Sequence, residues 1–478
     1  MRTPDGISTK DPAASARDRR PGIGIRPRAS VPVFRALLLG LPVAAGIAAG
    51  PAIARAEVLA ASPADYLRVI AGSGPDDVVR LRPGIYRRGL RLEGLTGKAG
   101  EPVVITGPSK GRAALYGSPG RNVITLKDSA YVVLRDLEID GRGVSGDGVK
   151  AEGGSDYAHH ITLEGLYIHD LGPGQQTVGI STKCPAWGWE VRGNVIVGVG
   201  TGMYFGDSDG TEPFWDGLIE QNLVRDTVGY NLQIKHQRAR PEGFAGASRG
   251  RDVTTIRYNV FSKARGAGEK MARPNVLVGH WPLAGPGRDD RYEIYGNLFY
   301  QNPTEALFQG EGNIALYNNL FFNSHDTPFP AVAIQPHNDI PRKVRVFFNT
   351  VVAPWKGIRV LYREEAVVLD QLVFGNAVFA QTPVEGRQCF KNHTAGYEAA
   401  GETLQAPVPA LGRLDLYPKP GRLRGPKIDM SRVEGFPAAR RDFNGAPRTG
   451  AYRGAYAGSG ENPGWKPGLG GTPHSQER

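Results

Sequence analysis

The sequence is poor in cysteine. Cys184 and Cys389 are the only two cysteines among 478 residues. Two cysteines are too few for a disulfide-rich scaffold, and their separation is not that of a metal site. The pair could form a disulfide after export, and a buried thiol at each position is equally compatible with the sequence.

The central part of the chain has almost no net charge. The formal charge of the whole chain is +11, but residues 1–56 hold 9 basic and 3 acidic residues and residues 419–478 hold 11 and 5, so residues 57–418 carry a net charge of −1. Net charge therefore gives no argument that this part binds nucleic acid or another polyanion. We expect no nucleic-acid partner, and only local clusters can indicate an acidic ligand.

The N-terminal segment, residues 1–56, has the composition of an export signal. It is basic up to Arg35, runs apolar from Ala36 to Ala54 and ends in small-x-small cleavage signatures. The Arg19-Arg20 pair resembles a twin-arginine signal, although the apolar residues expected after such a pair are missing. Glycines and prolines interrupt the apolar run, which argues against a membrane anchor. We expect a periplasmic or secreted protein with no stable membrane span after cleavage.

Continuous helical patterns are few, and one short module repeats along the chain. The modules are 22 to 30 residues apart, with two longer spacings of 37 and 38 residues. A unit this short cannot bury its own apolar face, so successive units must stack. The modules include the segments Val132–Ile139, Ile161–Ile168 and Trp189–Ile196, then triplets that begin at Asn222, Asn259, Asn297, Asn319, Asn349 and Asn376.

These repeats predict an all-β parallel β-helix, in which each coil stacks on the last at about 4.8 Å. The recurring Asn suits an internal ladder, because Asn tolerates a left-handed corner and its amide can bond to the Asn one coil away. Pro63–Ile70 predicts a short N-terminal capping helix. We expect one β-helix domain over residues 57–455 and, because the end of the chain has no apolar period, a disordered tail over residues 456–478.

The chain resembles the pectate-lyase-like right-handed parallel β-helix superfamily of secreted proteins. Leu81–Tyr86 and Gly97–Ile105 are similar to the entry of exported polysaccharide lyases of the chondroitinase B and alginate lyase kind, and Arg441–Tyr452 is similar to the closure of such proteins. The resemblance covers roughly residues 60 to 455 and implies the fold more than the reaction, since β-helices host many functions.

The sequence also departs from that superfamily. The Glu-rich calcium segment and the Asn-Lys-Ser segment of the chondroitinase B type are missing, and Gln335–Asp339 only echoes the Asp-Pro-His-Asp of alginate epimerases. No catalytic residue is therefore carried over by motif.

Ionisable side chains recur in the second strand of successive coils. If equivalent positions stack, these side chains fall near one line, next to two Arg-, Gly- and Pro-rich insertions at 238–253 and 263–274 that could wall a groove. The expected line comprises Lys183, Asp207, Lys235 with His236, His280 and Glu311, with His337 as its continuation.

The densest part of this line is Tyr230–Gln237, which predicts a strand with Leu232 and Ile234 in the core and Gln233, Lys235 and Gln237 outside. A uronate lyase needs a base for the proton next to a carboxylate and a cation that neutralises that carboxylate. Nearby positive charge can lower the pKa of a Lys enough for it to act as the base. The predicted catalytic residues are Lys235, His236, Arg238 and His280.

Acidic and aromatic residues complete the predicted site. Asp207, Asp209 and Glu311 offer the hard oxygen donors that Ca²⁺ prefers, although Asp side chains more often stabilise turns. Aromatic rings could stack on sugars or simply fill corners and loops. The predicted substrate-binding residues are Tyr204, Gln233, Trp215, Trp281, Gln309 and His337.

Three functions remain open from the sequence. The favoured one is a monomeric lyase that cleaves an acidic, uronate-containing polysaccharide by β-elimination. A glycoside hydrolase on the same scaffold would need two facing carboxylates, such as Asp207 with Asp209 or Glu311. A non-catalytic carbohydrate-binding or surface solenoid would scatter Lys235, His280 and Asp207 over different faces.

Overall fold

The computed structural model describes residues 57–155, 157–240, 243–244, 250–267, 271–361 and 370–468. The predicted export signal lies outside these residues. Among the described residues, no helix is long and apolar enough to cross a membrane. Helix α1 (Tyr66–Ala71) lies at the start of the described chain and buries Tyr66 and Ile70 in the core, so the capping helix is confirmed.

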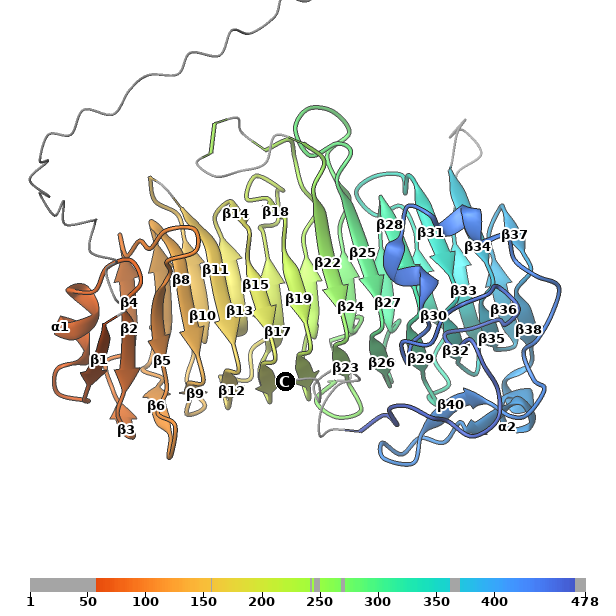
Figure 1. The fold of residues 1–478 in the computed structure, drawn as a ribbon, viewed down its shortest axis with the longest axis horizontal. Helices are drawn as coiled ribbons and strands as arrows, with labels where there is room; N and C mark the ends of the chain where they lie inside the picture. The colour runs from red at the N-terminus through yellow and green to blue at the C-terminus, as the bar shows by residue number, and fades with distance from the viewer. Residues whose placement is uncertain are drawn as a thin grey trace, which may run out of the picture. The chain divides into compact units, whose positions relative to one another are not determined.

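The described chain coils into a right-handed parallel β-helix with three parallel sheets (Figure 1). Each coil contributes one strand to each sheet in the order sheet 1, sheet 2, sheet 3. Every strand pairs with its counterparts in the coils before and after, as the sequence repeats predict. Sheet 1 comprises β1 (Val58–Ala61), β2 (Val78–Leu81), β5 (Val103–Thr106), β8 (Ser129–Arg135), β11 (Ala158–Glu164), β15 (Glu190–Arg192), β19 (Leu218–Glu220), β22 (Val253–Arg257), β25 (Arg291–Tyr295), β28 (Ile314–Tyr317), β31 (Val344–Phe347), β34 (Gln371–Phe374) and β37 (Cys389–Phe390).

The other two long sheets follow the same order along the chain. Sheet 2 comprises β3 (Gly84–Tyr86), β6 (Ala113–Tyr116), β9 (Glu138–Asp140), β12 (Tyr167–His169), β16 (Val195–Val197), β20 (Leu223–Arg225), β23 (Val260–Ser262), β26 (Leu298–Tyr300), β29 (Leu320–Phe322), β32 (Thr350–Val352), β35 (Ala377–Phe379) and β38 (His393–Ala395). Sheet 3 comprises β4 (Leu90–Glu93), β7 (Ile124–Lys127), β10 (Val149–Glu152), β13 (Val178–Lys183), β17 (Thr201–Phe205), β21 (Leu232–Ile234), β24 (Val276–Val278), β27 (Phe308–Gly310), β30 (Pro330–Ile334), β33 (Lys356–Val360) and β36 (Thr382–Glu385).

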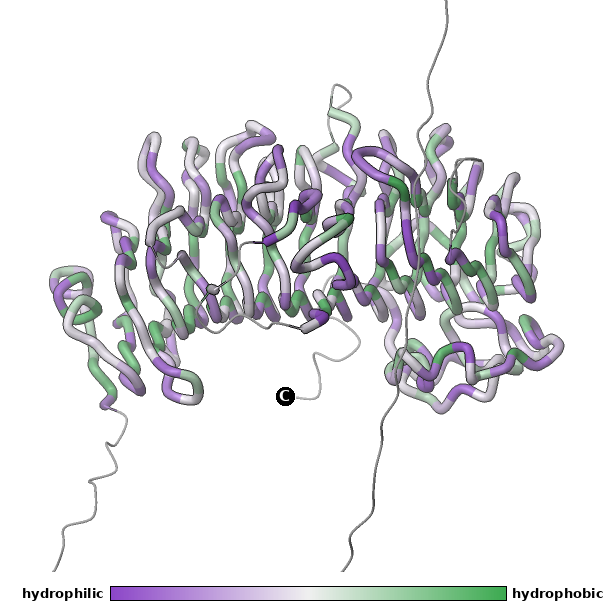
Figure 2. Tube along the Cα trace, turned by 90° about the horizontal axis from the view of Figure 1, so that it is seen from above, coloured by the Kyte–Doolittle hydropathy of each residue, from purple (hydrophilic) through white to green (hydrophobic). Residues whose placement is uncertain are grey.

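Apolar side chains of the three sheets meet inside the coil. Alternate residues of each strand point inward, so stacked coils produce columns of like side chains. In sheet 2, Phe261, Phe299 and Phe321 are fully buried, with neighbouring rings 5.5 and 4.5 Å apart between centroids. Figure 2 shows hydrophobic and hydrophilic residues alternating along the coils. The rings of successive coils are therefore in contact, and the core is continuous from one coil to the next.

An asparagine ladder runs along the corner between sheets 1 and 2. The backbone N–H and the side-chain amide of each Asn both donate to the Oδ1 of the Asn one coil further on, for example Asn259 to Asn297 at 2.9 Å for both bonds. The predicted ladder is therefore confirmed. The left-handed backbone, however, belongs to the residue before the Asn, such as Gln221 with a φ of 56° and Tyr258 with a φ of 57°. The ladder Asn residues are 194, 222, 259, 297, 319, 349, 376 and 392.

The segment after the last coil is ordered and covers the outside of the solenoid. Residues 396–468 contain η1 (Tyr397–Ala399), α2 (Ala400–Thr403), η2 (Met430–Val433), η3 (Pro437–Arg440) and the antiparallel pair β39 (Leu404–Ala406) and β40 (Asp415–Pro418). Apolar side chains of this segment bury the outer face of sheet 2 in the later coils, and η2 and η3 pack on sheet 1.

The C-terminal part of the predicted domain arrangement needs correction in two places. The coils end at Ala395, so residues 396–455 are a covering segment rather than further solenoid. The predicted tail is ordered at least to residue 468, because Tyr456 is fully buried and Asn462 donates to Asp415 at 2.9 Å. These residues lack an apolar period because they pack irregularly on a finished sheet face. Residues 469–478 lie outside the described part.

The two cysteines do not form a disulfide with each other. Cys184 is buried in the core, whereas Cys389 is exposed in the last strand of sheet 1. The solenoid therefore depends on the Asn ladder and the packed interior for its cohesion.

We predict that Asn297→Ala strongly destabilises the fold. The substitution leaves the backbone N–H and the amide of Asn259 without their buried acceptor, and it removes the donor to the Ile256 carbonyl oxygen. Each unpaired buried group costs about 1–3 kcal/mol, so we expect a loss of about 3 kcal/mol or more in the free energy of unfolding, measured by urea denaturation.

The matched control is Asn392→Ala at the end of the ladder. Asn392 accepts from the same two groups of Asn376 and donates to the Val373 carbonyl oxygen, but it is only half-buried and no further Asn follows it. Because water can replace the lost bonds at this half-buried end of the ladder, we expect about 1 kcal/mol for this variant. Equal losses for the two variants would contradict the ladder as the main tie between coils.

Candidate functional site

Strand β21 has the orientation that its sequence predicts. Leu232 and Ile234 are fully buried, Gln233 lies between them on the outer face, and Lys235 follows at the strand end and is half-buried. Gln237, expected on the outside, instead points inward and its amide donates to the Tyr292 hydroxyl at 3.1 Å. The alternation therefore holds for the strand and stops at the corner that follows.

The outer face of sheet 3 carries two lines of side chains across successive coils. The first line pairs Tyr204 with Gln233, Gln233 with Leu277 and Leu277 with Gln309. Three of the predicted substrate-binding residues therefore lie in one row. The side-chain amide of Gln309 donates a hydrogen bond to the Glu305 carboxylate at 3.0 Å.

The second line lies two residues further along each strand and contains two amines. Lys235 N–H donates to the Phe205 carbonyl oxygen and Gly279 N–H to the Ile234 carbonyl oxygen, both at 2.9 Å. This pairing places Lys235 between Gly206 and Gly279. Lys183 continues the line beyond Gly206. The line therefore reads Lys183, Gly206, Lys235, Gly279 and Glu311 over five coils.

The two glycines allow neighbouring backbone to approach closely on either side of Lys235. At Gly279 a Cβ would stand 2.2 Å from the backbone nitrogen of His236, and at Gly206, where φ is +90°, it would stand 3.0 Å from the Glu212 carbonyl oxygen. Neither position therefore accepts a side chain without a shift of the backbone. Among the described residues the Lys235 amine has no hydrogen bond or ion pair.

The second amine, Lys183, is held in place. Its Nζ lies 3.5 Å from the ring centroid of Tyr204 and donates to the Gly206 carbonyl oxygen at 3.4 Å. Burial lowers the pKa of Lys183 to about 8, and burial also lowers the pKa of Lys235. The ring and the carbonyl favour the ammonium form, so Lys183 is mainly charged at neutral pH. Lys183 was in the predicted line but not among the predicted catalytic residues.

His236 and His280 are one residue further along, on adjacent coils. Their rings stack with centroids 5.4 Å apart, and the Asn338 amide lies 2.6 Å from Nδ1 of His236. Nδ1 of His280 lies 2.9 Å from the Trp281 carbonyl oxygen, which only accepts, so this nitrogen carries the proton in neutral His280. Burial and the charges of His280 and Lys235 lower the pKa of His236.

The loop 335–341 reaches the His236–His280 pair, and the residue that makes the contact was not among the predicted site residues. Asn338, not the predicted His337, contacts His236, while His337 is exposed. Asp339 lies 4.0 Å from Nδ1 of His280. The sequence predicts that the segment Gln335–Asp339 continues the line, but only the path of the loop shows which of its side chains faces the coil.

The three predicted metal ligands do not form one cluster. Asp207 and Asp209 accept hydrogen bonds from Thr211 in their own turn, and Thr211 lowers the pKa of Asp209 to about 2. Glu311 instead accepts from the backbone N–H groups of His280 at 3.3 Å and Asn338 at 2.5 Å. These carboxylates therefore stabilise loops around the two amines. Two of them share one turn, so they are not facing carboxylates from separate coils.

The predicted aromatic contacts lie in the interior. Trp215 and Trp281 have exposed fractions of 0% and 1%. Trp215 stacks on Trp187, and the strands β14 (Ala186–Trp187) and β18 (Phe214–Trp215) pair in parallel; Trp281 stacks on Tyr292. Neither indole therefore presents a face to a sugar, and for Trp215 the first insertion adds to the cover, because Arg240 and Phe244 lie 4.9 and 6.0 Å from the centroid of its ring.

Of the insertion arginines, only Arg238 was predicted to be catalytic. Arg238 is exposed beside the 206–212 turn, where its N–H donates to the Gly210 carbonyl oxygen at 2.9 Å. Arg240 is buried in ion pairs with Asp252 and Asp290, each at 2.8 Å. The insertions therefore include structural ion pairs as well as exposed charge.

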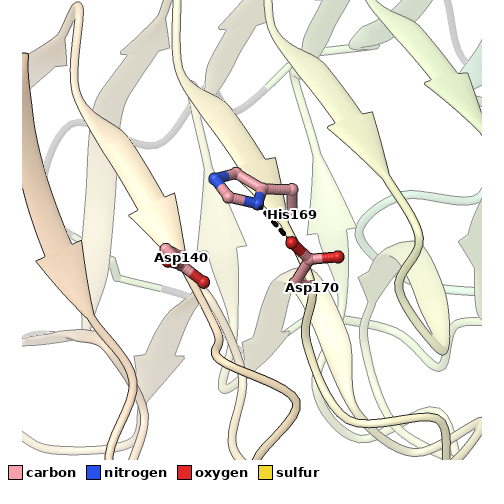
Figure 3. Close-up of side chains that lie close together, drawn as sticks. All are labelled: Asp140, His169 and Asp170. Atoms are coloured by element: carbon pink, nitrogen blue, oxygen red, sulfur yellow. Dashed lines mark hydrogen bonds and ion pairs between the residues drawn. The ribbon is translucent and has the colours of Figure 1, made fainter.

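A separate cluster of ionisable groups lies on sheet 2. Asp140 of β9, His169 of β12 and the adjacent Asp170 offer ligand atoms within 4.8 Å of one another. Figure 3 shows these three side chains close together on neighbouring coils. Nδ1 of His169 lies 2.9 Å from Asp170 and its Nε2 lies 3.3 Å from Glu138. Because carboxylates already occupy both ring nitrogens, hydrogen bonding accounts for this arrangement.

The fold follows from the paired strands, and solved structures of similar architecture are known. The chain is similar to an alginate lyase from Paenibacillus sp. str. FPU-7, with 18% identity and a TM-score of 0.43 over 59% of this chain and 97% of that one. It is also similar to the pectate lyase Pel9A, with 13% identity and a TM-score of 0.43 over 71% and 80%.

A third similar structure is the A-module of a mannuronan C-5 epimerase from Azotobacter vinelandii, with 15% identity and a TM-score of 0.39 over 70% of this chain and 92% of that one. No protein-family model and no curated protein matches the sequence. The named activities belong to those proteins.

We predict that Lys235→Ala raises the pKa of His236. The ammonium of Lys235 disfavours a second positive charge on the imidazole, so its removal makes protonation easier. An NMR titration of the His236 ring measures the change. Lys127→Ala is the matched control on sheet 3, since Lys127 pairs with Glu93 at 2.7 Å. An unchanged His236 pKa in Lys235→Ala would contradict the placement of this amine.

Proposed function

We propose that this protein is a polysaccharide lyase that cleaves uronate-containing glycans by β-elimination on the outer face of sheet 3. The observation that carries the proposal is the line Lys183, Gly206, Lys235 and Gly279. It presents a half-buried amine, flanked in its row by two positions that have no side chain, and a second, fixed amine two coils away, about 9.6 Å along the stack. One position over Gly206 is therefore flanked by both amines.

The chemistry of β-elimination needs both amines in different roles. The proton next to a uronate carboxylate becomes removable only when a cation neutralises the carboxylate and stabilises the charge that develops. Lys183, held as an ammonium by the Tyr204 ring and the Gly206 carbonyl, supplies that cation. Lys235, whose amine has no partner among the described residues, supplies the base.

In the proposed reaction, the neutral amine of Lys235 takes the proton at C5. The electron pair of that bond forms the C4–C5 double bond, and the bond from C4 to the glycosidic oxygen breaks. The departing oxygen takes a proton from the ammonium just formed on Lys235, so no outside reactant is needed. Gln233 and the His236–His280 pair lie beside this position and are proposed to bind sugar hydroxyl groups.

We predict that Lys235→Arg abolishes activity while Lys183→Arg retains part of it. Arg keeps a positive charge but cannot lose its proton, so it can replace a cation and not a base. We expect a loss of about 10³-fold or more for Lys235→Arg and about tenfold for Lys183→Arg, on the scale of lost general-base catalysis. The assay follows the ultraviolet absorbance of the new double bond with pectate, alginate and glycosaminoglycans.

Lys127→Ala serves again as the control and should keep full activity. The reverse order, with Lys183→Arg inactive and Lys235→Arg active, would exchange the two roles. Saturated products would indicate a hydrolase instead. No turnover of any acidic glycan, with or without Ca²⁺, would contradict the proposed function.

We further predict a bell-shaped dependence of kcat/KM on pH that loses its alkaline limb in Lys183→Arg. A Lys is charged below its pKa and neutral above it, so Lys235 gains its function as pH rises and Lys183 loses its own. Because burial lowers the pKa of Lys183 to about 8, the loss falls within the measurable range. An alkaline limb that persists in Lys183→Arg would contradict the cationic role.

A further inference from the structure

A pocket of about 300 Å³ lies next to the start of the solenoid, at the corner between sheets 2 and 3. Four of its lining residues are arginines, and none is acidic. The lining consists of Leu67, Arg87, Arg88, Gly89, Leu90, Arg91, Tyr116, Ser118, Arg121 and Asn122.

The positive charge of this pocket is not neutralised by the neighbouring protein. None of the arginines 87, 88, 91 and 121 has an ion-pair partner among the described residues, and all four are exposed. Elsewhere on the solenoid exposed cations do pair across coils, as Arg112 does with Glu138 at 3.0 Å. A concave surface lined by one sign of charge attracts and concentrates oppositely charged ligands.

An aromatic ring helps to position the guanidinium groups. Arg87 lies over the Tyr116 ring at 5.6 Å from its centroid, and Arg142 from the next coil lies over the same ring at 4.8 Å. Guanidinium groups bind carboxylate and sulfate groups through two parallel N–H bonds. The ring holds the Arg87 guanidinium beside the pocket, and guanidinium groups can bind planar or tetrahedral oxyanions.

One pocket arginine, Arg91, belongs to the outer face of sheet 3, and the other three lie at the corner between sheets 2 and 3. Strand register connects Arg91 through Thr125, Lys150, Ser181 and Tyr204 to Gln233. Five strand spacings of about 4.8 Å separate Arg91 from Gln233, which is about 24 Å along the stack. An extended polymer that lies along sheet 3 over Gly206 therefore passes toward the arginine pocket.

We propose that the arginine pocket is a distal binding site for the carboxylate or sulfate groups of an acidic glycan whose reacting sugar lies over Gly206. This inference rests on the proposed function, because it takes the amine line as the place of reaction. A second contact on one polymer raises affinity through effective concentration, and only chains long enough to span both places gain from it. The pocket thus selects long acidic chains over short fragments.

The test compares Arg91→Gln/Arg121→Gln with a control of equal charge, Arg413→Gln/Arg424→Gln. The control arginines are exposed on the covering segment, far in sequence from sheet 3. All proteins are full chains, and thermal unfolding verifies that each is folded. Binding is measured in the Lys235→Ala background, so that turnover does not consume the probe. The probes are oligogalacturonates and sulfated glycosaminoglycan oligosaccharides, from disaccharide to dodecasaccharide.

We expect the pocket variant to raise the Kd for dodecasaccharides about tenfold or more, with the disaccharide Kd unchanged. Loss with only the carboxylate or only the sulfate series identifies the group bound. An unchanged dodecasaccharide Kd, or an equal loss in the control variant, would overturn the inference. Tighter, equally Arg-dependent binding of a single-stranded oligonucleotide of matched charge would also overturn it.

Failure of the proposed function gives a different result. In that case, protein with Lys235 intact forms no unsaturated product from any glycan, whatever the Kd values are. If turnover occurs and the pocket variant cleaves long and short substrates with wild-type kcat/KM, only the distal site is rejected.

Discussion

The asparagine ladder between sheets 1 and 2 is the interaction on which the rest of the structure depends. Each ladder Asn ties its own coil to the next through its backbone N–H and its side-chain amide, as Asn297 does with Asn319. Pairing between coils has a side-chain period of two, so a slip by one residue would exchange the inner and outer faces. By holding the register, the ladder lets a residue in one coil form a line with residues in its neighbours.

The outer faces of the three sheets carry different rows of side chains. On sheet 1 an alternating row of charges, including Arg135, Glu164 and Arg192, gives way to stacked aromatic rings that η2 and η3 cover. On sheet 2 the later coils have an apolar outer face, which residues 396–468 bury. Sheet 3 presents polar and charged side chains of both signs instead, including Glu152 next to Lys183, and it carries the amine line and Arg91 of the arginine pocket. Sheet 3 is therefore the face whose outer side chains can bind a polar polymer.

The repeats made the fold predictable, because stacking imposes its period on the sequence. Asn spacing and alternation located the coils, the ladder and the orientation of Leu232 and Ile234. The same reasoning placed Lys183 and Lys235 on one line but set His236 and His280 on it as well, whereas these lie one residue further along. Periodicity predicts which strand positions repeat, but it does not predict how side chains are oriented where a strand ends and a corner begins.

The remaining errors concern segments outside the repeat. Trp215 and Trp281 are buried because they stack on Trp187 and Tyr292, and Asn338 rather than His337 meets His236 because of a loop path that no period encodes. The covering segment was missed for a similar reason: Tyr456 packs against Tyr417 and Phe443 on a finished sheet, in an irregular pattern. Long-range packing of this kind leaves no local signature.

The central claim is that sheet 3 binds an acidic sugar between Lys183 and Lys235. The most direct measurement is a crystal structure of the Lys235→Ala protein with an oligouronate. The account predicts that a uronate carboxylate lies within hydrogen-bond distance of the Lys183 amine, with the sugar ring over Gly206 and its C5 hydrogen directed toward position 235. A sugar bound on another sheet face, or a carboxylate held away from Lys183, would contradict it.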